Sequence, residues 1–331
     1  VRDSEQLQLG VYAIAPLENI VVELSAEKQP LYETQLTLKP GESWRHTLPQ
    51  NDAGRLTIKV KTADNQLLLD YREHITQQTS LPEPASAPAM PEEIHNCDEL
   101  YFIGQHLEQY NHASRYAADY YRRAIALDPQ DYRNNVALGT LAFNQADWVL
   151  AEQCARAALL RAHRLNKNPR DGEASMLLAS ALERQGDEQG AWDHYYKASW
   201  SGNCRDAAWW ALARLAMKRG DTVDALEKVN TSLQFNASNH LAMGLKALAL
   251  AKSGRTKAAQ EYIFACLKPY PLSYPLHCVR WMIEPGDEAR ENLLRVTGRR
   301  GINGSLLAGW LLSIGQKQAA KEVLEVLDCQ E

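Results

Sequence analysis

The chain has no long apolar run, no excess of basic residues and no paired cysteine motif, and each absence argues against a class of protein. The longest apolar stretch without charge, Ile302 to Ile314, is about half the length that would span a bilayer. A net charge of −5 does not suit a phosphate backbone, which calls for a clustered basic face. We therefore expect no membrane span and no nucleic-acid partner.

The cysteines are scattered and none forms Cys-x-x-Cys; they are Cys97, Cys154, Cys204, Cys266, Cys278 and Cys329. Unpaired cysteine in a chain of this size indicates a reducing compartment, so we expect a cytoplasmic location. The first residue is Val1 and not methionine. We expect that a preceding segment was removed, so that a targeting signal before Val1 cannot be read from this sequence.

Motifs that carry catalysis or hold a cofactor are also missing. The sequence contains no nucleophile elbow, glycine-rich phosphate loop, His-Glu-x-x-His or acidic calcium loop. The neighbouring acids Asp98 and Glu99 lie where a helix is expected to begin, and the helix dipole stabilises carboxylates there. We predict a chain that is not itself an enzyme and that binds no cofactor or metal ion. This prediction does not extend to a longer parent protein.

What the sequence does contain is a repeat of small residues. The repeated alanines are Ala117, Ala151, Ala191, Ala225 and Ala259, at steps of 34, 40, 34 and 34 residues. Four residues after them stand Tyr121, Ala155, Tyr195, Val229 and Ile263, and three further on Ala124, Ala158, Ala198, Ser232 and Cys266. Small residues at such positions let neighbouring helices approach closely, because bulk there would overpack.

Glycines recur with the same step of 34 residues. Gly186, Gly220 and Gly254 lie in turns where a left-handed helix cap favours glycine. A period of 34 with small residues at fixed positions is typical of the tetratricopeptide repeat, a pair of antiparallel helices. We predict a mostly α fold over residues 94–331, a tetratricopeptide superhelix or α-solenoid of about six to seven helix pairs.

The repeat is irregular in two places. Extra residues between Arg161 and Gly172 predict a lengthened helix and a loop, which is either a spacer or a binding loop. After Pro271 we expect a shortened repeat and then a final pair. The four predicted helices are Tyr274–Ile283, Arg290–Thr297, Ile302–Ser313 and Lys317–Leu327.

Residues 1–76 show a different period. Apolar and polar residues alternate around Ile20, Val22 and Leu24 and again around Leu56 and Val60. Alternation of this kind, separated by turn residues, predicts a small β-sandwich of about five to seven strands. Residues 77–93 contain four prolines and read as an extended linker, after which Asn96 or Asp98 is expected to cap the first helix.

The first helix of the array is unusually rich in hydrogen-bonding groups. Its candidate binding residues are Gln105, His106, Glu108, Gln109, Tyr110 and His112. One interpretation is a solvated terminal helix, or one that packs on the β-domain; another is a polar recognition site. Metal binding by His106 and His112 is disfavoured, because a spacing of six residues puts them on different helix faces.

The first helices of the repeats line the concave groove of such a superhelix. By register the groove positions are Arg133, Thr140, Phe143 and Asn144, then Met176, Ser180, Glu183 and Arg184, then Trp210, Arg214 and Lys218. We expect a mixed surface with an exposed tryptophan beside cations, which suits a peptide or protein segment better than a small metabolite. These positions are therefore candidate binding residues for such a partner.

The order of segments resembles the C-terminal part of a family of large bacterial proteins of unknown function. The resemblance is carried by Leu100–Tyr110, Asp128–Asn135, Asn168–Glu173 and Tyr196–Trp200. In that family a long β-rich region, similar to sugar-mutarotase and glycoside-hydrolase accessory folds, precedes a tetratricopeptide array. The resemblance implies a carbohydrate-related setting without an established activity, and it places any sugar site mainly before Val1.

We therefore interpret the chain as a non-catalytic interaction module. Its expected partner is a protein or peptide segment in the groove, or an upstream domain of the same protein, with a carbohydrate as a further candidate. The alternative is an accessory part of a carbohydrate-active enzyme that supplies one wall of a sugar site. Exposure of His106, Glu108 and Tyr110 in a deep polar pocket would favour this alternative.

Overall fold

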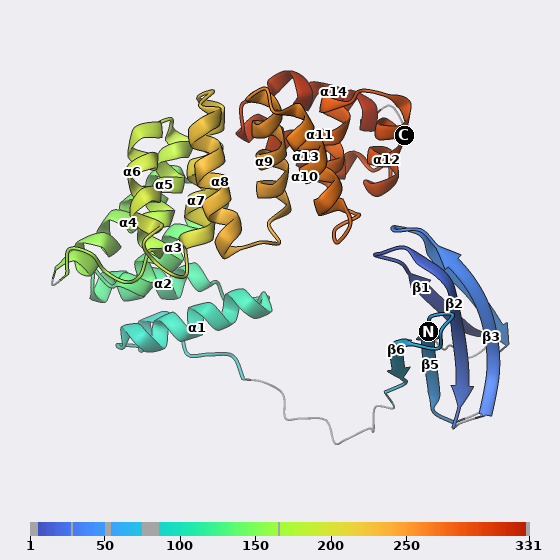
Figure 1. The fold of residues 1–331 in the computed structure, drawn as a ribbon. Helices are drawn as coiled ribbons and strands as arrows, with labels where there is room; N and C mark the ends of the chain where they lie inside the picture. Colours follow the sequence, from blue (N-terminus) through green and yellow to red (C-terminus); the bar gives the residue numbers. More distant parts are fainter. Residues whose placement is uncertain (1–5, 28, 50–53, 75–85, 165, 329–331) are drawn as a thin grey trace. The chain divides into compact units, whose positions relative to one another are not determined.

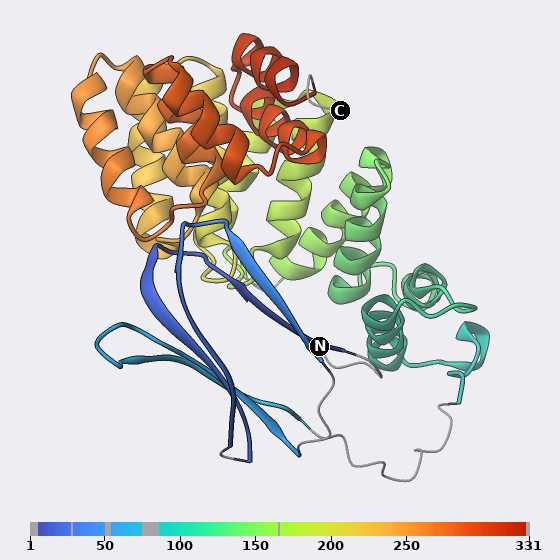
Figure 2. The same ribbon diagram turned by 90° about the vertical axis from the view of Figure 1, so that its right-hand side faces the viewer.

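Six strands near the N-terminus of this computed structural model form two antiparallel sheets. The structure describes residues 6–27, 29–49, 54–74, 86–164 and 166–328. β1 (Gln6–Tyr12) pairs with β4 (Ser43–Pro49). The second sheet has the order β3 (Gln29–Leu38), β2 (Leu17–Ala26), β5 (Leu56–Lys61) and β6 (Leu67–Arg72). β2 and β3 twist side by side along their length (Figures 1 and 2).

The alternating apolar residues point into a core that both sheets share. Ile20, Val22 and Leu24 are each 1% exposed, because successive side chains of a strand point to opposite faces. Leu9 of β1 packs in the cluster that contains Leu24, and Trp44 of β4 packs against the same residues. The six strands before the helices agree with the strands that the alternation of apolar and polar residues predicts.

Fourteen α-helices follow within the described residues, after a short 3₁₀ helix, η1 (Pro91–Glu93). The first eight are α1 (Cys97–Tyr110), α2 (Ala117–Leu127), α3 (Tyr132–Asn144), α4 (Trp148–His163), α5 (Glu173–Gln185), α6 (Glu188–Ala198), α7 (Arg205–Lys218) and α8 (Thr222–Phe235). The others are α9 (His240–Lys252), α10 (Thr256–Leu267), α11 (Tyr274–Ile283), α12 (Asp287–Val296), α13 (Gly301–Ser313) and α14 (Lys317–Asp328). Predicted features at residues 51–53, at 75–85 of the linker and at Cys329 lie outside the described residues.

The chain divides into two units, which are considered separately. One contains residues 1–83, 260–307 and 323–331, and the other contains residues 84–259 and 308–322. In the second unit consecutive helices pack as pairs, α1 with α2 through α7 with α8, and each pair contacts the next (Figure 1). This confirms the predicted tetratricopeptide solenoid, while the predicted domain boundaries at 76 and 93 stay predictions.

The repeated small residues are buried as the register requires. Four of the five repeat alanines are 0% exposed, and Ala117 is 8% exposed. The residues four positions later are buried as well. Among the third set only Cys266 departs from the pattern, because it is half-buried where Ala124, Ala158, Ala198 and Ser232 are buried. Close helix packing therefore sets the period of the sequence.

Backbone conformation explains the repeated glycines and the helix starts. Gly186, Gly220 and Gly254 have φ of 90°, 83° and 79°, in the left-handed region that side chains disfavour. The side chain of Asn96 accepts hydrogen bonds from the backbone N–H groups of Asp98 and Glu99. Asn96, and not Asp98, is therefore the cap of the first helix.

The two predicted irregularities are present. α4 has 16 residues where α2 and α6 have 11, so the insertion lengthens this helix. α11 and α12 have 10 residues each, and α12 begins at Asp287, three positions before the predicted start. In the part of the chain that the structure describes, no helix is both long and apolar enough to cross a membrane.

Candidate functional site

The polar residues of α1 lie at its surface. Gln105, His106, Glu108, Gln109 and Tyr110 are exposed, and His112, just after the helix, is half-buried. The rings of His106 and Tyr110 are in contact, with centroids 4.5 Å apart. Glu108 accepts a hydrogen bond from the Tyr121 hydroxyl of α2, and this bond ties the two helices together. Among these candidate residues, the carboxylate of Glu108 therefore joins two helices. The amide, imidazole and phenol groups of the exposed residues face solvent.

Arg133 connects α3 to α1. Its guanidinium pairs with Asp98 and lies 5.0 Å from the ring centre of Tyr101 and 5.6 Å from that of Phe102. A cation at this distance from an aromatic face is attracted by the ring. Phe102 remains 58% exposed. The structure therefore brings a predicted groove cation together with two aromatic residues that the groove register did not include.

The other groove positions of α3 lie near the turn to α4. Thr140 and Asn144 are exposed, and Phe143 makes an edge-to-face contact with Trp148, with ring centroids 4.9 Å apart. Arg184 from α5 lies 5.7 Å from the ring centre of Trp148. The predicted residues Phe143 and Arg184 thus meet through a tryptophan that sequence reasoning did not single out.

Three of the predicted groove residues take part in a hydrogen-bonded network between α5, α6 and α7. Arg214 donates to both carboxylate oxygens of Glu183, with Nη1 2.6 Å from Oε1. The Tyr195 hydroxyl donates to Glu183 over 2.9 Å and lies 3.2 Å from the hydroxyl oxygen of Ser180. Both charged side chains are only 15% exposed, so the ion pair is largely desolvated. The ion pair holds adjacent repeats together, and each of its two charges already has a partner within the protein.

The remaining predicted groove positions on α5 and α7 lie outside this network of hydrogen bonds. Trp210 and Met176 are half-buried on α7 and α5, and Lys218 pairs with Glu188 of α6. Of the predicted groove residues on α3, α5 and α7, Thr140, Asn144 and Arg184 are therefore exposed, and Glu183 and Arg214 are paired with each other. Trp210 is half-buried and not exposed as predicted, because it lies on a helix that packs between its neighbours. We call the predicted groove residues of α3, α5 and α7 the groove face.

Four titratable groups with buried or half-buried side chains have pKa values shifted away from neutral pH. Burial raises the pKa of Glu183, but the hydrogen bond and charge of Arg214 outweigh it and hold the pKa below its usual range. Burial raises the pKa of the Tyr195 phenol and of the Cys154 thiol, and it lowers the pKa of His194. A general acid, base or thiolate nucleophile needs the opposite displacement, toward the working pH.

The pKa of Glu173, an exposed residue at the start of α5, is shifted in the other direction, toward neutral pH. Burial and the charge of Asp171 raise its pKa, while a hydrogen bond from Asn203 opposes the rise. The Asn203 amide lies 3.2 Å from Glu173 and 3.5 Å from Asp171, where α5 begins. This contact links the loops before α5 and α7, and it gives Glu173 a structural partner.

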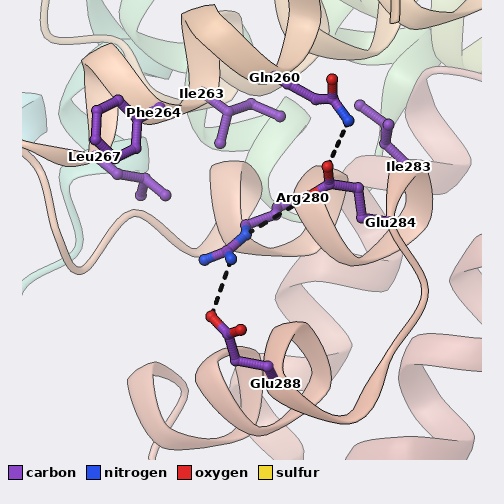
Figure 3. A pocket seen from close by; sticks show the side chains of 8 residues that line it. All are labelled: Gln260, Ile263, Phe264, Leu267, Arg280, Ile283, Glu284 and Glu288. Atoms are coloured by element: carbon purple, nitrogen blue, oxygen red, sulfur yellow. Dashed lines mark hydrogen bonds and ion pairs between the residues drawn. The ribbon is translucent and has the colours of Figure 1, made fainter. Parts of the chain in front are cut away.

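A second surface feature lies among α10, α11 and α12, all within one unit. A hollow of about 440 Å³ is lined by Gln260, Ile263, Phe264 and Leu267 of α10 and by Arg280, Ile283, Glu284 and Glu288. Figure 3 shows Phe264 and Leu267 together on one side and Arg280 between the two glutamates. The guanidinium of Arg280 lies 3.0 Å from Glu288 and 4.0 Å from Glu284. Sequence reasoning did not find this hollow, which we call the α10–α12 hollow.

Comparisons with known proteins give different matches for the strand-containing region and for the chain as a helical repeat protein. The profile of the family described as YphG-like protein, second domain, matches residues 1–71. The solved structures that resemble the chain include a tetratricopeptide repeat protein from Parabacteroides merdae. It is 14% identical, with a TM-score of 0.50 over 70% of this chain and 98% of that protein.

A second similar structure is pilF of Pseudomonas aeruginosa. It is 18% identical, with a TM-score of 0.50 over 67% of this chain and 96% of that protein. At such low identity these similarities show the fold alone. The chain therefore combines a segment similar to the second domain of YphG-like proteins with a helical array of the tetratricopeptide-repeat fold.

Proposed function

We propose that the chain is a non-catalytic interaction module that holds a protein or peptide segment on its groove face. The observation that carries this proposal is the Glu183–Arg214–Tyr195 network, in which each charged group already has a partner within the protein. Such a network fixes the positions of α5 and α7 before a ligand arrives, and preorganisation lowers the cost of binding. The exposed side chains above it are then available for contacts.

The composition of the groove face supports a polypeptide partner. Trp210 is half-buried, so its ring offers one apolar surface while its backbone position is fixed by α7. Tryptophan and arginine dominate the energetics of protein interfaces, and both occur here as Trp210 and Arg184. Thr140 and Asn144 add neutral hydrogen-bonding groups on the neighbouring helix. A peptide backbone could use these groups without bringing a charge of its own.

The test is a selection of peptides from a random library against the full chain, followed by calorimetric titration of one selected peptide. We expect Trp210→Ala to weaken binding about tenfold or more, as removal of a central interface tryptophan does. Trp200→Ala is the matched control, because Trp200 is 58% exposed just after α6 and is not a groove residue. Equal binding by both variants, or no selected peptide, would contradict the proposal.

A carbohydrate-related setting is the second part of the proposal. It is supported by the resemblance carried by the chain's own segments. Sugar hydroxyls would contact the exposed amides of Gln105 and Gln109, the imidazole of His106 and the phenol of Tyr110.

This alternative makes the chain an accessory wall of a sugar site, and a glycan array probed with the full chain tests it. Binding that is lost in Gln109→Ala and kept in Trp210→Ala would favour the alternative. Binding to peptides and to no glycan would favour the interaction module. A cytoplasmic location stays part of the proposal; it is supported by Cys97, Cys154, Cys204, Cys266 and Cys278, which are all free thiols.

A further inference from the structure

Aromatic side chains gather around a further hollow on α6, the second helix of its pair (Figure 1). This hollow of about 540 Å³, which we call the α6 hollow, is lined by Trp192, Asp193, His194, Tyr196, Lys197 and Trp200. Tyr196 is 44% exposed and Trp200, just after the helix, is 58% exposed. Trp192 is half-buried, because it packs against the core of the array. Large apolar rings left at the surface around a hollow are typical of a binding site.

We propose that the α6 hollow binds a neutral oligosaccharide whose sugar rings stack on Tyr196 and Trp200. One face of a sugar ring carries C–H groups, which can cover the face of an aromatic ring while the hydroxyls stay at the edges. Two exposed aromatic rings in succession suit successive sugar units. The site goes beyond the proposed function, because α6 contributes neither to the groove face nor to the exposed residues of α1.

The charges of the lining argue for a ligand without charge. Asp193 supplies one carboxylate and Lys197 one ammonium group, and both side chains are exposed. Burial and the charges of Arg156 and Lys197 lower the pKa of His194, so its imidazole is neutral at neutral pH. Arg156 is itself paired with Glu152 over 2.7 Å. An anionic ligand would therefore meet a carboxylate in the lining, and like charges repel.

A cationic ligand is disfavoured at the other end of the hollow, where the ring of Trp192 already carries two cations. The Arg219 guanidinium and the Lys228 ammonium lie 4.9 Å and 5.0 Å from its ring centre. Arg219 pairs over 3.7 Å with Glu188, a carboxylate that Lys218 shares, and Lys228 is paired within α8. A further cation would add repulsion without gaining an unshared carboxylate there.

Hydrogen bonding distinguishes a sugar from other neutral ligands. The Asp193 carboxylate can only accept hydrogen bonds; it takes one from Gln189 over 2.9 Å and has room for more. The Lys197 ammonium can only donate. Because a hydroxyl both donates and accepts, neighbouring sugar hydroxyls can serve both groups. A proline-rich segment also docks on aromatic grooves, but proline has no N–H, so such a segment would cover Asp193 with few donors for it.

Saturation-transfer NMR with the full chain tests the proposal. The probes are short linear oligomers of glucose, of mannose and of xylose, and the comparison ligands are an oligomer of galacturonic acid and an oligoproline. We expect a neutral oligomer to bind, with the strongest transfer to the C–H protons of one ring face. Its affinity should be the same at low and high salt, because the ligand has no charge to be screened.

Variants identify the contact residues. Tyr196→Ala and Trp200→Ala should each weaken oligosaccharide binding about tenfold or more, with Trp200→Phe in between because it keeps an aromatic face. The matched control is Tyr116→Ala, since Tyr116 is 68% exposed just before α2 and should leave binding within about twofold. Because Trp200 is exposed, its variants should keep the helical circular dichroism of the parent chain.

Three outcomes would overturn the proposal. They are no binding of any neutral oligomer, equal or tighter binding of the acidic oligomer or of oligoproline, and unchanged binding in Trp200→Ala. Loss of binding in Gln109→Ala with Trp200→Ala unaffected would place the sugar on α1, and it would also overturn this site. The groove-face proposal is tested with a separately selected peptide and Trp210→Ala, so failure of the α6 hollow leaves it standing.

Discussion

Arg214 donates two hydrogen bonds to Glu183 from the adjacent repeat, and both side chains are 15% exposed. The two residues lie 31 positions apart on the first helices α7 and α5. The pair is therefore a joint between repeats, made by two residues that the register predicted as binding positions of the groove. A solenoid is stabilised by contacts between neighbouring repeats, and this is one of its polar contacts.

Removing one partner of this pair should destabilise the array. Glu183→Gln leaves the Arg214 guanidinium without its carboxylate, at a cost of about 3 kcal/mol in the free energy of unfolding. We expect a lower urea midpoint by circular dichroism. Asp119→Asn is the control, because Asp119 pairs with Arg122 within α2 and the two side chains are 53% and 59% exposed. Equal midpoints for the two variants would contradict the assigned role.

The same pair predicts a dependence on pH. Arg214 holds the pKa of Glu183 below its usual range, although burial opposes this. The stabilisation is therefore fully present above the pKa of the unfolded glutamate, and it is lost as the pH falls through the lower folded-state value. The difference in urea midpoint between the parent chain and Glu183→Gln should shrink in that acid range. A constant difference from neutral to acid pH would show that the carboxylate does not titrate with folding.

Two glycines should respond to alanine in opposite directions. A Cβ on Gly139 of α3 would lie 2.7 Å from Leu177 Cδ2 and 2.9 Å from Cys154 Cβ, which is too close. Gly139→Ala should cost about 1–3 kcal/mol through overpacking. A Cβ on Gly309 of α13 meets no atom within 4 Å, so Gly309→Ala should stabilise its helix by about 0.5–1 kcal/mol. Thermal melts of both variants test the pair, and shifts of the same sign would contradict this packing.

The repeat register makes a sharper prediction at a buried alanine. Ala191 on α6 is 0% exposed, so Ala191→Phe forces a ring into space that other helices fill. We expect local unfolding of the neighbouring pairs, seen as faster amide hydrogen exchange in α5 and α6. Lys321→Ala, on the exposed face of α14, should change little. Equal thermal melts for these two variants would be incompatible with the register.

Thiol reactivity should follow burial. Burial raises the pKa of the Cys278 thiol to about 12 and that of Cys154 to about 11. Because the thiolate is the reactive form, both should react slowly with a thiol reagent until the chain unfolds. Cys97, which is half-buried, should react faster. Mass spectrometry of partially labelled chain measures this order, and prompt labelling of Cys278 in the folded state would contradict it.

Much of the fold could be predicted because close helix packing leaves a periodic record. The buried alanines at 117, 151, 191, 225 and 259 and the left-handed glycines fix both the period and the turns. The shortened repeat was also visible, since Pro271 and Glu284-Pro285-Gly286 interrupt the pattern. These features depend on local sterics, which a sequence expresses directly.

The details of the site depend on side chains that meet across repeats, and these were less accessible. Register placed Arg214 on the groove face but could not show that Glu183 neutralises it. The spacing of 31 residues, one repeat less three positions, is a signal that could have paired them. The α10–α12 hollow could not be predicted, because its lining side chains meet only when α10, α11 and α12 pack together. A surface hollow between packed helices has no periodic pattern in the sequence.

The most direct test of the interaction module is amide hydrogen exchange of the full chain with and without a selected peptide. The account predicts slower exchange in the first helices α3, α5 and α7, around Thr140, Arg184 and Trp210, because a bound segment contacts their exposed side. Exchange in the second helices α4 and α8 should change little. Protection confined to α4 and α8, or to the strands, would contradict binding on the groove face.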